Sequence, residues 1–436
     1  MNRCPVCGYP SPLYAGRSAQ VRQSNAGLLG MIWNVSIMLM LLLFIIDIAT
    51  LVYSSMKLIM PELAAGSLTE QPIFTIFPTL AALFYLTGTT TILVYFILIL
   101  AVIFFTYAYL SLADGKGMLR LIASPISSVM PRLRSKNRWV MVAQLFLAVT
   151  FFQFAYILLL QALGVQTNPP PGLEEEPTWL LMFDLANASV FEEVVSRVAL
   201  IGLPMFVGSF LMRSMSLRYR NPGIPADTKS DRRYLIGSFR YLIGGNMDRR
   251  SPKPAVKLGV LLTLVSAVFF GFAHEGWGDW KLLPAFVAGL ALGYVFLRGG
   301  FVAAVLLHFA VDYFSAAAVL VQDDPALTAF LSFLLLALLF LGVGFLLYYL
   351  IYGYNLLVDI FGSGRPPTPV PSPAAGDTGL APFGSVTQEG TQIGSPQQYT
   401  AQTSVPPFAA VCPYCSWPES RFVDGKLVCS NCGKKR

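Results

Sequence analysis

Long apolar segments restrict the fold of this chain more than any other feature. A transmembrane helix needs about 20 predominantly apolar residues to cross the hydrocarbon core of a bilayer. Eight segments are apolar over roughly that length or more: 28–53, 87–112, 139–163, 178–212, 256–274, 282–298, 300–321 and 326–352. Charged residues make up 12% of the chain, against about 25% in soluble proteins. We predict an all-α polytopic membrane protein with about eight transmembrane helices, which form a bundle over residues 28–353.

Two parts of this prediction leave alternatives open. Residues 72–112 can hold either one span that follows an interfacial segment or two short spans. Residues 178–212 are longer than one bilayer crossing requires. Gly202 and Pro204 offer a place where that helix could break.

The loops between the predicted spans alternate in charge. Residues 113–138 and 213–257 are rich in arginine and lysine, whereas the loops on the other side are acidic or sparsely charged. Because short cytosolic loops carry an excess of Lys and Arg, we predict a multi-pass protein of the cell membrane with both termini cytosolic. The net charge of +7 is concentrated in these loops. We therefore expect contact with the lipid bilayer and no nucleic-acid partner.

Three motifs place ionisable residues inside the apolar segments. They are Glu192-Glu193-Val194-Val195-Ser196-Arg197, Phe270-Gly271-Phe272-Ala273-His274 and His308-Phe309-Ala310-Val311-Asp312, and they include both histidines of the chain. A charge at the bilayer centre costs on the order of 3 kcal/mol on insertion scales. Ionisable groups kept at that cost indicate a functional site.

Helical spacing predicts how these side chains are arranged. Glu193 and Arg197 are four residues apart, so they share a helix face and can form a buried ion pair. Glu192 points about 100° away from Glu193 and can face a polar cavity. His308 and Asp312 also share one face. A glutamate in a poorly solvated cavity can act as a general base towards water, and a carboxylate beside a histidine can fix its tautomer.

Other interpretations of intramembrane polar residues stay open. A histidine within a span can be a hydrogen-bonded packing residue, and polar pairs can link helices. Asp47 and Asp184 also lie in spans, and we interpret both as structural because no motif accompanies them. Counting along straight helices places His274 near the outer end of its span and His308 nearer the inner end. Only irregular or tilted helices around a cavity would bring the two together.

In their order and spacing, the three motifs resemble those of the CPBP family, which comprises CAAX prenyl endopeptidases and bacteriocin-processing or immunity proteins. The resemblance covers about residues 139–321. It implies an intramembrane endopeptidase in which Glu192 activates the attacking water, His274 and His308 complete the site, and Asp312 occupies the last motif position. Because members are labelled metalloproteases, it also implies a catalytic divalent metal, zinc, as a candidate cofactor. The candidate catalytic residues are Glu192, Glu193, Arg197, His274, His308 and Asp312.

The chain departs from the family pattern at two positions. Asp312 stands where eukaryotic prenyl proteases typically have asparagine and many prokaryotic relatives have aspartate, which favours a hydrolase without a strict CAAX substrate. Ser196 stands where an aromatic residue is common. His274-Glu275 does not continue as a zincin motif, because position 278 is glycine.

The six cysteines form three Cys-x-x-Cys pairs. We place a zinc ribbon at residues 409–436, on a flexible linker, 362–408, that is rich in Pro, Ser, Gly and Gln. In such a ribbon four thiolates hold a structural zinc ion. The predicted ligands are Cys412, Cys415, Cys429 and Cys432. Cys4 and Cys7, in a cytosolic segment at residues 1–27, form half of such a site, and their role stays open.

Together these features predict an intramembrane endopeptidase that hydrolyses a peptide bond of a membrane-associated or lipidated substrate. Water activated by glutamate and histidine would carry out the reaction, and the ribbon would bind a protein partner. The alternative is a non-catalytic membrane scaffold or immunity-type binding protein that recruits partners through its zinc ribbon. A transporter with a proton-coupled glutamate and histidine relay is a third alternative.

Overall fold

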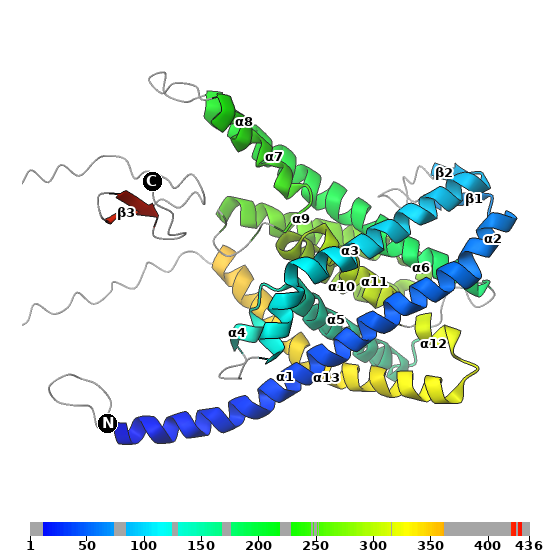
Figure 1. The fold of residues 1–436 in the computed structure, drawn as a ribbon, viewed down its shortest axis with the longest axis horizontal. Helices are drawn as coiled ribbons and strands as arrows, with labels where there is room; N and C mark the ends of the chain where they lie inside the picture. Colours follow the sequence, from blue (N-terminus) through cyan, green and yellow to red (C-terminus); the bar gives the residue numbers. More distant parts are fainter. Residues whose placement is uncertain are drawn as a thin grey trace, which may run out of the picture. The chain divides into compact units, whose positions relative to one another are not determined.

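The computed structural model covers the chain in two units, residues 1–367 and residues 368–436. It describes residues 12–73, 84–123, 130–167, 176–218, 228–245, 247, 251, 253–314, 316–361, 420–423 and 426–429. Figure 1 shows the helices of the first unit, coloured along the chain from blue α1 to yellow α13. The cysteine pairs at Cys4 and Cys7 and at Cys412 and Cys415 lie outside the described residues, as does Cys432.

Helices account for almost all of the first unit. The α-helices are α1 (Pro12–Ser54), α2 (Met60–Ala65), α3 (Thr89–Ala123), α4 (Met130–Leu133), α5 (Arg138–Ala162), α6 (Thr178–Glu193), α7 (Leu203–Arg218), α8 (Thr228–Ile236), α9 (Lys253–Phe272), α10 (Asp279–Gly299), α11 (Phe301–Tyr313), α12 (Ala316–Leu320) and α13 (Pro325–Phe361). The π-helical segments are Ser55–Ile59 and Val194–Gly202, and the 3₁₀ turns are Phe239–Tyr241 and Glu275–Trp277.

In the part of the chain that the structure describes, eight helices are long and apolar enough to cross a membrane. They begin at Leu28, Thr89, Arg138, Thr178, Pro254, Asp279, Phe301 and Pro325. This confirms the prediction of an all-α polytopic membrane protein with about eight spans. The described part of residues 72–112 holds one span, α3, which is preceded by a short hairpin. In that hairpin, β1 (Glu70–Ile73) pairs antiparallel with β2 (Phe84–Thr87).

The long fourth span does not break at Gly202 or Pro204. It passes instead from α6 through the π-helical segment into α7. The Leu203 N–H bonds to the carbonyl of Val198, five residues earlier. Pro204, the next residue, has no N–H, so the change from π to α falls where one backbone donor is missing. Gly202 allows a close approach here, because a Cβ at this position would lie 2.3 Å from the carbonyl oxygen of Leu242.

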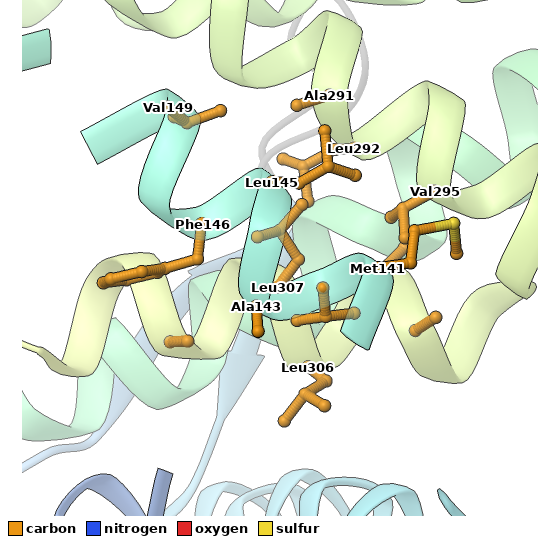
Figure 2. Close-up of a cluster of buried hydrophobic side chains, with 14 of the residues drawn as sticks. Met141, Ala143, Leu145, Phe146, Val149, Ala291, Leu292, Val295, Leu306 and Leu307 are labelled. Carbon is orange, nitrogen blue, oxygen red and sulfur yellow. The ribbon is translucent and has the colours of Figure 1, made fainter. Parts of the chain in front are cut away.

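Helix α5 packs against several helices, including α11, which carries the motif residues His308 and Asp312. Residues 139–149 of α5 are all buried and, apart from Gln144, apolar, as expected for a helix surrounded by other helices. The helix packs against α10, α11 and α13. Figure 2 shows Met141, Leu145 and Val149 of α5 beside Leu292 of α10 and Leu307 of α11. This core holds α11 in position.

A turn at Gly300 sets where α11 begins. Gly300 has a φ of 87°, which favours glycine, and separates α10 from α11. The segment before α9 braces this turn, because the Phe301 N–H donates to the Ile243 carbonyl at 2.8 Å and the Gly245 N–H donates to the Phe296 carbonyl at 2.8 Å. Helix α11 is consequently only 13 residues long and almost entirely buried.

The second unit contains one described hairpin. Its strands are β3 (Ser420–Val423) and β4 (Lys426–Cys429), and they pair antiparallel with Ser420 opposite Cys429. The hairpin follows the first cysteine pair of the predicted ribbon in sequence and ends at Cys429, the first cysteine of the second pair. The ribbon itself stays a prediction.

Candidate active site

The first motif forms a buried ion pair that extends to a histidine. Glu193 ends α6, and its Oε2 lies 3.3 Å from Nε of Arg197, with both side chains 0% exposed. The other oxygen of Glu193, Oε1, lies 2.9 Å from Nδ1 of His308. Because a carboxylate in an ion pair can only accept, Nδ1 of His308 carries the proton in this contact. The predicted pairing of Glu193 with Arg197 is present, and it also fixes the tautomer of His308.

Arg197 is further held by the neighbouring helix α9. Its Nη1 donates to Oγ of Ser266 at 2.6 Å, and Ser266 in turn donates to the carbonyl of Ser196 at 2.6 Å. The guanidinium lies over the ring of Phe270, 4.9 Å from its centroid. The π-helical segment and α9 are thus joined through polar contacts that are sealed from solvent.

The second nitrogen of His308 faces two carboxylates. Its Nε2 lies 3.4 Å from Oδ2 of Asp312 and 3.8 Å from Oε2 of Glu192. Ser189 Oγ donates to Asp312 Oδ2 at 3.3 Å. The separation of Glu192 from His308 is longer than a hydrogen bond, so the two can share a water molecule. Glu192 is 35% exposed, whereas Glu193 is sealed, and the two adjacent glutamates therefore have different surroundings.

His274 lies on the same cavity as His308. Helix α9 ends at Phe272 and the chain turns through Glu275–Trp277, so His274 follows the end of the helix. Its Nδ1 contacts the Phe270 carbonyl at 2.8 Å, which leaves Nε2 as its available polar atom. The Phe270 ring packs against both imidazoles, with centroid distances of 4.8 and 5.7 Å. Straight helices were expected to place His274 and His308 at different depths in the membrane. Helix α9 instead ends before His274, and α11 is short, and the two imidazoles contact the same Phe270 ring.

A cavity of about 50 Å³ lies between α5, α9, α10 and α11. His274, His308 and Asp312 line it, and so do Gln153 of α5 and Lys281 of α10. The glutamates are not part of its wall. Glu192 was expected to face a polar cavity; instead it approaches the His308 ring from α6, beside the cavity.

The structure adds polar residues to the site that sequence reasoning missed. Ser266 precedes Phe270 by one helical turn, and Ser189 precedes Glu193 by one turn, so each lies on the motif-bearing face of its helix. That periodicity could have identified both. Lys281 follows Trp277 and Trp280, and a lysine beside tryptophans is typical of a membrane-interface anchor. The sequence pattern therefore gives no indication that Lys281 lines the cavity.

The two span aspartates have different environments. Asp184 accepts a hydrogen bond from Gln71 at 3.4 Å, which ties α6 to the β1–β2 hairpin. Asp47 is fully buried in α1, and within the described part of the chain its carboxyl oxygens have no hydrogen-bond partner. Neither lines the cavity.

Within the described ranges, no group of three His, Cys, Asp or Glu side chains is arranged to hold a metal ion. As placed, the candidate donors Glu192, His274, His308 and Asp312 do not form a ligand set. The catalytic divalent metal stays a prediction.

Comparison with known protein families matches one segment of the chain. Residues 174–314 match the family described as type II CAAX prenyl endopeptidase Rce1-like. The match spans α6 to α11 and contains every intramembrane motif residue, and it supports the resemblance to the CPBP family. No curated protein and no solved structure matches the chain significantly.

Proposed function

We propose that this protein is an intramembrane endopeptidase of the CAAX-protease type, acting on a membrane-associated or lipidated substrate. One observation carries the proposal. Glu193 and Arg197 hold the His308 ring so that its Nε2 is directed towards Glu192 and Asp312. A second imidazole, His274, lies on the same cavity. A carboxylate base beside a fixed imidazole can activate water for peptide hydrolysis.

In the proposed reaction Glu192 is the general base. It accepts a proton from a water molecule whose oxygen bonds to the carbonyl carbon, and the carbonyl π electrons move onto the carbonyl oxygen. When this tetrahedral oxyanion collapses, the C–N bond breaks and the leaving amine takes the proton from Glu192. One water is consumed, and the products are a carboxylic acid and an amine.

The remaining motif residues orient this chemistry. Glu193 accepts the Nδ1 proton of His308 and so holds the ring with Nε2 turned towards the water. Asp312 lies 3.4 Å from the same nitrogen and stabilises positive charge on the ring. Arg197 balances the charge of Glu193 and keeps it an acceptor.

Newly formed peptide termini test the proposal. Membranes from hosts that express wild type or Glu192→Ala at equal, folded levels are compared by labelling of peptide termini. We expect a set of termini that occurs only with wild type, and the residues flanking those termini define the substrate class. Identical termini in both samples would exclude the peptidase and favour a non-catalytic scaffold or immunity-type binding protein.

We further propose that residues 409–436 form a zinc ribbon that binds a protein partner, with both termini cytosolic. Its ligands would be Cys412, Cys415, Cys429 and Cys432, since four thiolates suit a structural zinc site.

Zinc analysis of the purified chain tests the ribbon. We expect about one tightly bound zinc per chain, since a unit this small has little core and depends on its metal to fold. The double variant Cys412→Ser/Cys415→Ser should lose that zinc, while Cys4→Ser/Cys7→Ser should retain it. Elemental analysis after dialysis against a chelator gives the stoichiometry. Equal zinc in wild type and the Cys412 and Cys415 variant would contradict the assignment.

A further inference from the structure

Lys281 places a positive charge on the cavity that the proposed reaction does not yet use. It lies in the first turn of α10 and lines the cavity together with His274 and Asp312. Its ammonium lies over two indole rings, 5.3 Å from the centroid of Trp277 and 5.7 Å from that of Trp280. The rings restrict the lysine on one side while it remains part of the cavity wall.

The ammonium of Lys281 interacts electrostatically with Asp312 and Glu192. Among the described residues, the ion pairs of the structure do not include Lys281. Arg197, the other cation of the site, is committed to Glu193 and is fully buried. Among the described cavity-lining residues, Lys281 is therefore the cation available to a bound molecule.

The other carboxylates of the site give such a cation a role. Glu192 and Asp312 lie beside His308, and their negative charges oppose the oxyanion that forms during peptide hydrolysis. Donors directed at developing charge in a poorly solvated site are commonly the largest contribution to catalysis. A lysine that served only as an interface anchor would direct its ammonium to headgroups, whereas Lys281 lines the reaction cavity.

We propose that Lys281 is a catalytic residue whose ammonium binds the carbonyl oxygen as it becomes the tetrahedral oxyanion. This inference rests on the proposed peptidase function. The lysine donates a hydrogen bond to the oxyanion and keeps its proton when the intermediate collapses. It adds a transition-state contact to the site and leaves the role of Glu192 as base unchanged.

Steady-state kinetics of the full-length protein test this role. The probe is a quenched fluorogenic peptide that reproduces a cleavage site found in wild-type membranes. Lys281→Met should lower kcat about 100-fold with little change in KM, as loss of one oxyanion donor does. Lys281→Arg, which retains the charge, should recover a substantial part of the rate. Lys57→Met is the matched control, because Lys57 is exposed in the first candidate span and does not line the cavity.

The pH profile separates this role from charge balance. The titratable groups that interact electrostatically with Lys281 are Glu192 on α6, Asp312 on α11 and His274 after α9. If the lysine only kept Glu192 ionised, the rate of Lys281→Met would recover at higher pH. We expect the rate of Lys281→Met to stay low at high pH, and its difference from wild type to persist wherever Lys281 of the wild type is protonated. Recovery at high pH, a change confined to KM, or a wild-type rate would each overturn the inference while leaving the peptidase intact. Equal activity of wild type and Glu192→Gln would remove the proposed function and this inference together.

Discussion

Glutamine in place of Glu192 is expected to lower kcat for peptide hydrolysis by about 1,000-fold, within the range that a general base contributes. The amide keeps the size of the side chain but cannot accept the proton of water. Because Glu192 is 35% exposed and lies 3.8 Å from His308, no buried ion pair is lost. Thermal unfolding of the purified protein in detergent should therefore match wild type, and kinetics with the peptide substrate measure the loss.

The adjacent residue provides the control for this substitution. Glu193→Gln makes the same chemical change at a side chain that is 0% exposed and contacts both Arg197 and His308. It should lower stability as well as activity, because it leaves a buried guanidinium without its counter-ion. Glu192→Gln activity near that of wild type, or a loss of stability equal to that of Glu193→Gln, would contradict the division of roles between the two glutamates.

Local sequence periodicity accounts for what could be predicted of this site. The spacing of four residues places Glu193 with Arg197 and His308 with Asp312, because both pairs depend only on helix geometry. The spans follow from apolar length in the same way. Both are properties of a single helix, and both agree with the structure.

Contacts between different helices could not be predicted from the periodicity of single helices. The contact between Glu193 and His308 joins residues 115 positions apart, and it depends on the depth at which α11 begins. That depth follows from the turn at Gly300 and its brace from Ile243, which apolar patterning does not encode. The π-helical segment after Glu193 was likewise missed, because a change in hydrogen-bond register leaves the apolar composition unchanged.

Arg197→Met is expected to destabilise the folded protein by about 3–5 kcal/mol, the cost of removing one partner from a buried ion pair. Methionine fills part of the space but leaves the carboxylate of Glu193 sealed with only His308 beside it. Ser266 also loses the guanidinium that donates to it at 2.6 Å. The apparent melting temperature, followed by tryptophan fluorescence in detergent, should fall by several degrees.

A double substitution distinguishes a lost charge pair from lost packing. In Glu193→Gln/Arg197→Met neither charge remains, so the double variant should be more stable than Arg197→Met alone. If the double variant is the less stable of the two, the contact of the Glu193 carboxylate with His308 outweighs the cost of leaving that carboxylate without Arg197. Activity should stay low in either case, because a neutral amide at position 193 no longer holds the Nδ1 proton of His308 as a carboxylate does. Stability can then be restored without catalysis, which would show that Glu193 serves both the fold and the orientation of the imidazole.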